Sequence, residues 1–272
     1  MAEATARHMA WTVSNPQNLL MLADVVTHSG WPTTKRDLFE QWSLRHLAEH
    51  KESLQNSPLG QYGAVDLMDP AGAACAALLI SDVSGIRLGS PSDDEVHGYQ
   101  SVPCANQEAV LAALSRRAFS SIEHNVVTYV HRTIAEYLGA RWLGKRVDEG
   151  LPLSRIQALL GVDSHPSASL RGFHAWLPLF VPLQATALIS KDPVGILTYG
   201  DAASLPPSQK NDLIKALAAV AAENAWFLSE NTSTYGLAGL SCSETAEQLI
   251  AILRSAVDPT RWGSHWRAIV LS

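Results

Sequence analysis

The sequence predicts a mainly α-helical protein with three parts: a helical region over 1–60, a small winged-helix-like unit over 61–148, and irregular α-solenoid-like helical repeats over 149–272. Three observations lead to this fold class. Apolar residues recur at helical spacing along most of the chain. Only 126–130 (VVTYV) has the β-branched and aromatic character of a strand, so one short β element is expected. After Leu151, short helical segments alternate with proline and glycine breaks, which is typical of stacked helix pairs.

The region 1–60 contains two predicted helices. The stretch 18–26 (NLLMLADVV) has helical spacing, Pro16 suits a first turn, and Ser14 or Asn15 can cap the helix. This helix should stop near Ser29–Gly30. A second amphipathic helix is expected over about 34–52.

The region 61–148 predicts a helix, an exposed loop and a helix–strand–helix unit. Asp69–Pro70 resembles a cap followed by a first-turn proline, and opens a helix through about Val83. The small residues of that helix indicate close packing against a neighbour. Residues 85–106 read as an exposed loop. The remaining elements are expected at 107–119 (helix), 126–130 (strand) and 133–147 (helix).

Seven further helices are expected in the last region, near 153–161, 168–180, 183–190, 207–228, 233–240, 243–257 and 261–270. The breaks between them are Asp192–Pro193, Leu205–Pro206–Pro207 and Asp258–Pro259. The segments have no strict sequence period, so an irregular solenoid is the simplest architecture.

The composition excludes several classes of protein. Of the 272 residues, 47% are hydrophobic, which excludes a disordered chain. Only 17% are charged, against about 25% on average, so some apolar surface is expected to face a partner. A net charge of −6 argues against non-specific nucleic-acid binding.

The ends and the cysteines predict a cytoplasmic protein. The first residues have no apolar run of the signal-peptide kind. The longest apolar stretch, Ala71–Ile80, is shorter than the ~20 residues that cross a bilayer, so no membrane partner is expected. Cys75, Cys104 and Cys242 are odd in number and far apart, which fits a reducing compartment, and Cys75 should be a packed thiol.

Two sequence patterns resemble catalytic motifs. Gly139–Arg146 has the glycine and lysine positions of a phosphate loop, but Arg146 replaces the magnesium-binding hydroxyl and the segment lies inside a predicted helix. His46, Glu49 and His50 match HxxEH, the inverted zinc-protease pattern, and both histidines would share a helix face. A solvated helix face explains this pattern more simply, because no further ligand motif follows.

The chain offers no other catalytic constellation. It has no GxSxG elbow, and the carboxylates of 93–95 (DDE) belong to the expected loop. His131 sits at a strand-to-helix corner, where Thr133 and Glu136 have the spacing of a capping box. We therefore expect no catalytic, cofactor-binding or metal-binding residues, no cofactor, and no enzymatic activity of this chain.

The run 129–143 (YVHRTIAEYLGARWL) resembles the end of the winged-helix region in bacterial STAND ATPases of the NACHT-like kind, with Gly139 in place of their usual alanine. Residues 14–20 (SNPQNLL) and 30–40 (GWPTTKRDLFE) resemble the helical lid that follows the ATPase core of these proteins, although Ser14 departs from the family's glycine. Residues 170–177 (LRGFHAWL) and 192–201 (DPVGILTYGD) resemble the start of their helical repeats.

The resemblance implies a C-terminal part of such an NTPase, with 1–60 as its helical lid. Its relatives include proteins of antiphage defence, and their Walker A and Walker B segments lie upstream of the lid. His131 is the nearest match to the family histidines that approach the nucleotide. The implied function is a non-catalytic regulatory and recognition portion that couples nucleotide state to protein–protein interaction. Its expected partner is a protein or the missing ATPase core, and an oligomer is compatible with this function.

Two alternatives stay open. One is a free-standing helical-repeat scaffold that binds protein through a concave surface. The other is a zinc hydrolase built on His46, Glu49 and His50. Under the first reading, the apolar patch that docks on an ATPase core should lie in 1–60 rather than in 151–272.

Overall fold

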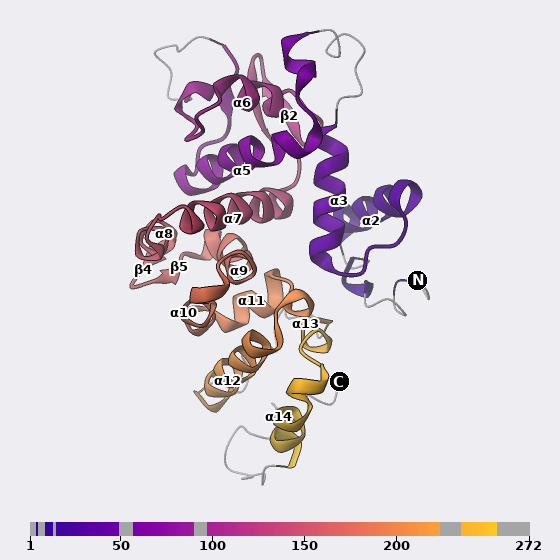
Figure 1. The fold of residues 1–272 in the computed structure, drawn as a ribbon, viewed down its shortest axis with the longest axis vertical. Helices are drawn as coiled ribbons and strands as arrows, with labels where there is room; N and C mark the ends of the chain where they lie inside the picture. Colours follow the sequence, from indigo (N-terminus) through magenta and orange to yellow (C-terminus); the bar gives the residue numbers. More distant parts are fainter. Residues whose placement is uncertain are drawn as a thin grey trace.

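The computed structural model describes residues 4, 9–12, 15–48, 57–89, 97–223 and 235–254. Helices dominate this part of the chain, with a small antiparallel sheet near one end, so the predicted mainly α fold class is confirmed. The helices stack along the long axis from α6 and α5 down to α12 and α14, while α2 and α3 flank the upper part of the stack (Figure 1).

The first two helices form where predicted. Helix α2 spans Pro16–Ser29, and the side chain of Asn15 caps it by accepting the backbone N–H of Gln17 at 2.9 Å. Helix α3 spans Lys35–Leu47 and ends earlier than expected, because Ala48 has extended backbone angles. Residues 49–56 lie outside the described residues.

Helix α5 spans Ala64–Ser81, so the start predicted at Asp69–Pro70 is wrong. The Asp66 carboxylate accepts the backbone N–H of Gly63 at 3.1 Å and closes the first turn there. Pro70 instead lies inside the helix and is buried. Apolar packing of Leu67 and Met68, which local cap chemistry does not reveal, extends the helix upstream.

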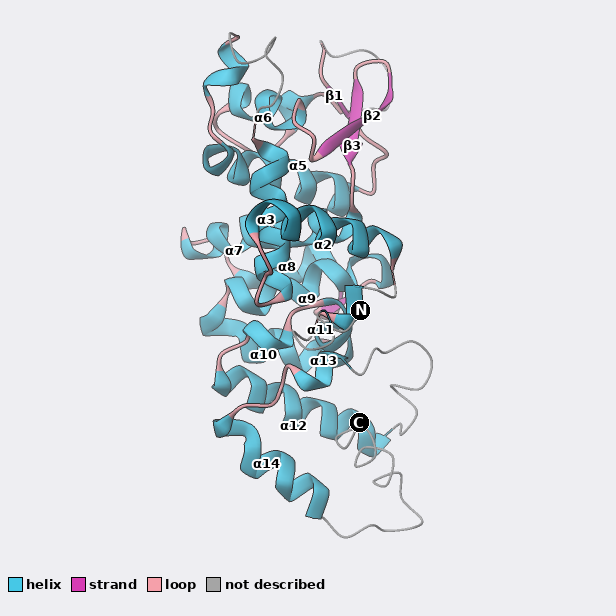
Figure 2. Cartoon of the chain, turned by 90° about the vertical axis from the view of Figure 1, so that its right-hand side faces the viewer, coloured by secondary structure: helices cyan, strands magenta, loops and turns pink. Residues whose placement is uncertain are grey.

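A three-stranded antiparallel sheet follows, in the order β1-β3-β2. Its elements are β1 (Ile86–Arg87), the short helix η3 (Tyr99–Ser101), α6 (Gln107–Leu114), β2 (Phe119–Glu123) and β3 (Val126–Tyr129). The winged-helix-like arrangement itself stays a prediction. Figure 2 shows the sheet beside α5 and α6.

Three expectations for this unit need correction. The helix predicted over 107–119 ends at Leu114, and Phe119 begins a strand. The sheet has three strands rather than one β element. The sequence did not indicate the other two, because β2 is largely polar and exposed and β1 has only two residues. The expected loop 85–106 holds β1 and η3, while 90–96, with the carboxylates of 93–95, lies outside the described residues.

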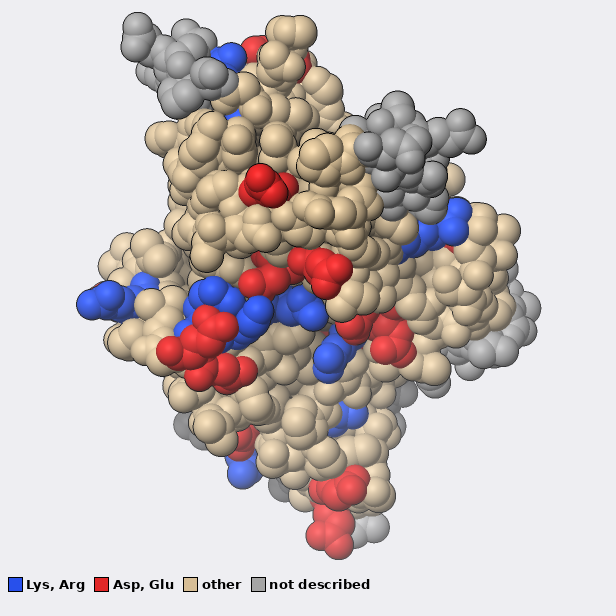
Figure 3. All heavy atoms as spheres, turned by 45° about the horizontal axis from the view of Figure 1, so that its top comes forward, with Lys and Arg blue, Asp and Glu red and all other residues tan. Residues whose placement is uncertain are grey.

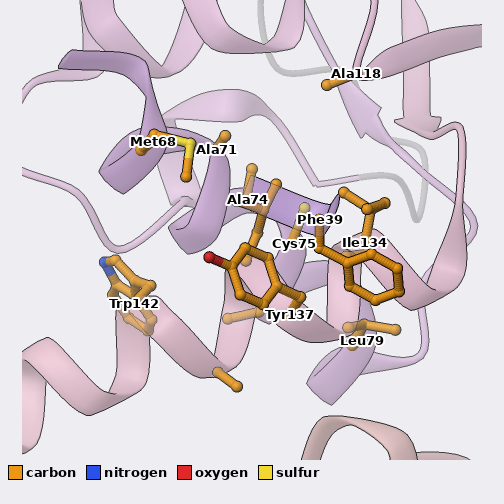
Figure 4. Packing of buried hydrophobic residues seen from close by; sticks show 14 of the residues in the cluster. Phe39, Met68, Ala71, Ala74, Cys75, Leu79, Ala118, Ile134, Tyr137 and Trp142 are labelled. Carbon is orange, nitrogen blue, oxygen red and sulfur yellow. The ribbon is translucent and has the colours of Figure 1, made fainter. Parts of the chain in front are cut away.

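Helix α7 (Arg132–Asp148) lies at the centre of the fold, between α5 and α9. Small residues allow the close approach: a Cβ added to Gly72 of α5 would lie 2.6 Å from the carbonyl oxygen of Leu138. The close packing predicted for this helix is therefore confirmed. Figure 4 shows Tyr137 of α7 among Phe39, Cys75 and other buried residues of α3 and α5.

The last region consists of short helices and one small hairpin. In order they are α8 (Leu153–Leu160), β4 (Gly161–Val162), β5 (His165–Pro166), α9 (Arg171–Phe180), α10 (Ala185–Lys191), α11 (Pro193–Tyr199), η6 (Ala202–Ser204), α12 (Pro207–Glu223), α13 (Tyr235–Ala238) and α14 (Ser243–Arg254). The chain bends by 107° between 168–180 and 182–191.

Helix α11 and the β4–β5 hairpin were not expected from the sequence. Asp192–Pro193 begins α11 rather than merely interrupting the chain, since the Asp192 carboxylate caps it by accepting the N–H of Gly195 at 2.9 Å. The helix predicted over 261–270 lies outside the described residues.

The described hydrophobic core forms two clusters. The larger one runs from Ala4 to Leu188 and crosses both expected domain boundaries, at 60 and at 148. The smaller one joins the ends of α9 and α10 to α11 and α12. Helix α5 is long and apolar enough to cross a membrane, but 61% of it is buried inside the protein.

Exposed apolar side chains are not confined to 1–60. That region contributes Leu19 and Leu20, whereas 151–272 contributes Leu159, Val162, Leu183, Tyr199 and Ile250. These are single side chains in both regions, so the apolar patch expected in 1–60 stays a prediction.

Candidate functional site

The start of α3 meets the end of α11, a contact that we call the α3–α11 junction (residues 33–37 and 197–204). The Lys35 ammonium donates hydrogen bonds to the carbonyl oxygens of Tyr199, at 2.7 Å, and Gly200, at 3.2 Å. The backbone N–H of Arg36 donates to the Asp201 carboxylate at 2.7 Å. Two segments 165 residues apart are thereby held together by charged groups.

These charges suit the helix ends that they touch. Lys35 lies against the last carbonyl groups of α11, where the helix dipole favours a cation. Asp201 accepts a free N–H of the first turn of α3, where the dipole favours an anion. The Asp201 side chain also accepts the hydroxyl of Ser204 at 2.7 Å, which fixes its orientation.

Aromatic rings surround Lys35. Its ammonium lies 5.1, 5.8 and 5.5 Å from the ring centroids of Trp11, Phe39 and Trp176. Burial lowers the pKa of Lys35 from 10.5 to about 8, against the opposing effects of the Asp201 and Glu136 charges. The half-buried ammonium is therefore held between these rings and the carbonyl oxygens of Tyr199 and Gly200.

Glu136 of α7 faces the junction from a second side. Its carboxylate accepts a hydrogen bond from Arg132 at 3.0 Å, and burial raises the pKa of this carboxyl group. Gly172 of α9 packs directly on it, and a side chain there would occupy the place of the carboxylate. The capping box predicted from Thr133 and Glu136 is wrong, because α7 is preceded by His131 as its cap residue and Glu136 turns toward Arg132 and α9.

A third charged contact joins α9 to α11. Arg171 donates two hydrogen bonds to the Asp192 carboxylate, at 2.7 and 2.8 Å. Nearby, His174 is buried, and neither of its ring nitrogens has a hydrogen-bond partner among the described residues. Burial lowers the pKa of His174 to about 4, so this imidazole is neutral in the folded protein at neutral pH.

His131, which the sequence resemblance singled out, contacts Trp42 of α3. Its ring makes an edge contact with Trp42 at 5.1 Å, and the ring of His46 stacks on the same tryptophan at 3.7 Å. Burial lowers the pKa of both imidazoles. His46 Nδ1 also lies 3.0 Å from the Trp42 carbonyl oxygen.

The HxxEH pattern is only partly described. Glu49 and His50 lie outside the described residues, and the described ones contain no group of three or more metal-binding side chains. The zinc alternative therefore stays an untested prediction.

The phosphate-loop pattern forms no loop. Gly139–Arg146 lies within α7, as expected from its helical periodicity. Lys145 and Arg146 pair with Asp69 of α5, at 3.1 and 3.3 Å. Figure 3 shows acidic and basic side chains gathered in a mixed band on this face, with wide uncharged areas above it.

The structure thus brings together segments that the sequence singled out separately: 30–40, 129–143, 170–177 and 192–201. Sequence reasoning named no member of the α3–α11 junction as a site residue. A signal was present in Lys35 and Asp201, charged residues at helix ends, but their pairing depends on the fold.

No protein-family model, curated protein sequence or solved structure matches this chain in comparisons with known proteins.

Proposed function

We propose that this chain is the non-catalytic regulatory and recognition portion of a signalling NTPase, coupling nucleotide state to protein–protein interaction in the cytoplasm. The observation that supports the proposal most is the α3–α11 junction. There the segment resembling the lid contacts the segment resembling the first repeats, through Lys35, Arg36 and Asp201.

The junction has the physical properties that coupling requires. Its cross-contacts are charge-assisted hydrogen bonds of half-buried Lys35 and buried Asp201, so breaking them without replacement leaves these charged groups without their partners. A displacement of α3 therefore costs free energy unless α11 follows. The hydrophobic clusters pack α7 against α9 and α10, and these two helices against α11. A change at the lid is therefore expected to reach the repeats.

The proposal also assigns a role to two histidines beside Trp42 of α3, His131 and His46. The ring of His46 stacks on the face of Trp42, and the ring of His131 makes an edge contact with the same tryptophan. These contacts lie between α3 and the start of α7. Both imidazoles are neutral at neutral pH because burial lowers their pKa values. In this proposal they sense the neighbouring core and perform no chemical step.

Phosphate release from ATP·Mg²⁺ by the purified chain tests the non-catalytic part of the proposal. We expect no turnover above buffer. Micromolar binding by calorimetry accompanied by turnover would show that this chain carries its own nucleotide chemistry.

A free-standing scaffold is the second candidate, and the exposed apolar side chains of the repeats favour it. Leu183 is 92% exposed, Val162 78% and Leu159 55%. Such side chains are suited to contact with a protein partner. The two candidates differ in genomic context, since the first requires a Walker A sequence encoded in frame upstream or in the adjacent gene, and the scaffold requires none.

A further inference from the structure

Helix α9 joins the two hydrophobic clusters of the fold. Its side chains Phe173 and Trp176 belong to the larger cluster with α7, whereas Ala175 belongs to the smaller cluster with α11 and α12. Small residues make the contact with α11, because a Cβ added to Gly200 would lie 2.6 Å from the carbonyl oxygen of Ala175. We call this contact the α9–α11 joint (residues 171–175 and 192–200).

One carboxylate holds the polar side of this joint. Asp192 accepts two hydrogen bonds from Arg171 of α9, at 2.7 and 2.8 Å. The same carboxylate accepts the backbone N–H of Gly195, in the first turn of α11. Asp192 therefore both caps α11 and ties it to α9.

His174 is buried at the joint and lacks a partner. Its residue is 1% exposed, and its two ring nitrogens have no hydrogen bond with any residue that the structure describes. A neutral imidazole carries one N–H, so leaving it unbonded costs free energy, and a second proton would add an unpaired buried charge. Burial accordingly lowers the pKa of His174 to about 4.

The nearest charged groups leave an added proton on His174 without a free anion. Asp192 is the carboxylate that favours this proton, but Arg171 and Gly195 already bind it. Arg171 and His165 of β5 oppose the proton by their own positive charge. The guanidinium of Arg171 also lies 5.7 Å from the ring of Tyr199 in α11.

The other elements packed against α9 supply no free carboxylate either, among the residues that the structure describes. Glu136 of α7 lies against Gly172 and pairs with Arg132 at 3.0 Å. Lys191 at the end of α10 is a cation, and its ammonium donates to a backbone carbonyl oxygen of the β4–β5 turn. The short helices η4 (Ala168–Leu170) and η5 (Pro182–Gln184) contain no titratable side chain.

We propose that the α9–α11 joint is an acid-sensitive contact, in which a proton on His174 separates α11 from α9 while the larger cluster stays folded. The imidazolium has no partner in the closed joint, so it is stabilised when α11 moves away and water reaches the ring. Separated α11 has only seven residues, too few to stay helical alone. This inference does not depend on the proposed NTPase function.

Amide hydrogen exchange of the full chain between pH 7 and pH 4.5 tests the proposal, with rates corrected for the intrinsic effect of pH. The reporting amides are Gly195, Ile196 and Gly200, which are hydrogen-bonded only while α11 is formed. Amides of 138–143 in α7 report on the larger cluster. The test variant is His174→Leu, and the matched control is His124→Leu, at an exposed position in the turn between β2 and β3.

We expect the protection of the α11 amides to fall roughly 50-fold more in the original chain than in His174→Leu over this pH range. This is the effect of a histidine that titrates at about 4 in the closed joint and near 6.5 in water. His124→Leu should behave like the original chain. At every pH the α7 amides should stay better protected than the α11 amides, because the joint opens without unfolding the larger cluster.

Two results would overturn the proposal. An equal fall in the original chain and in His174→Leu would show that His174 does not accept the proton. Equal protection of the α11 and α7 amides at every pH would show that acid unfolds the chain as a whole. The second comparison uses the original chain alone, so it decides the question even if His174→Leu does not fold.

Discussion

The half-buried ammonium of Lys35 makes the stability of this fold depend on pH in the alkaline range. Burial lowers the pKa of Lys35 to about 8, while an unfolded lysine titrates near 10.4. Between these values the unfolded chain binds more protons than the folded one, so the free energy of unfolding rises with pH. At roughly 1.4 kcal/mol per pH unit, the whole interval amounts to about 3 kcal/mol.

Replacing Lys35 by Met removes this titration and leaves the other alkaline titrations in place. We expect the original chain to gain about 3 kcal/mol of stability relative to Lys35→Met between pH 7.5 and 10.5. Urea unfolding followed by tryptophan fluorescence measures this difference, since Trp11 and Trp176 lie beside the ammonium. Lys215→Met, at an exposed position, is the control and should show no such trend.

A difference in the free energy of unfolding between the original chain and Lys35→Met that stays constant across this pH range would contradict the lowered pKa of Lys35. It would mean that Lys35 is solvated and that the α3–α11 junction is not a buried contact. A difference that falls with rising pH would reverse the sign of the effect and would be equally contradictory.

Three other predictions concern the core. Gly72→Ala should destabilise the protein by about 1–3 kcal/mol in urea unfolding, because the new methyl group would meet the Leu138 carbonyl, whereas Gly89→Ala has open space and should be nearly neutral. The pKa of His174, lowered by burial to about 4, predicts a loss of roughly 3 kcal/mol as the pH falls from 6.5 to 4; His174→Leu should abolish this loss in the same assay. Cys75 is buried and its pKa is raised, so iodoacetamide should leave it unmodified in the native chain while the two half-buried cysteines react.

Local chemistry predicted the helices whose caps and periodicity agree. Asn15 and Thr34 cap α2 and α3 as their side chains suggest, and the apolar stripe of α7 is the central packing surface. Predictions failed where tertiary packing overrode a local signal. Pro70 looks like a helix start, yet the apolar residues before it are buried by neighbouring helices, and α5 begins at Ala64.

Short elements were also beyond sequence reasoning. Strand β1 has two residues and exists through its pairing with β3, a partner some 40 residues away. Helix α11 has seven residues and too little periodic pattern to be recognised, although its Asp–Pro start is a helix signal. Boundaries and short strands depend on contacts that no local window contains.

The candidate site was hidden for the same reason. Lys35 and Asp201 are ordinary surface residue types in their local contexts. Only the fold brings Lys35 to the end of α11 and Asp201 to the start of α3. The sequence resemblance singled out segments that meet in the fold, but it did not indicate which atoms join them.

We propose that this chain couples a neighbouring nucleotide-binding core to a protein partner. The affinity between the chain and a Walker A-bearing core encoded beside it, measured with ADP and with ATP·Mg²⁺, tests this proposal. We expect a difference of about 5-fold or more between the two nucleotide states, the lower range of allosteric coupling. Equal affinity in both states, or no binding to that core, would contradict the proposed coupling.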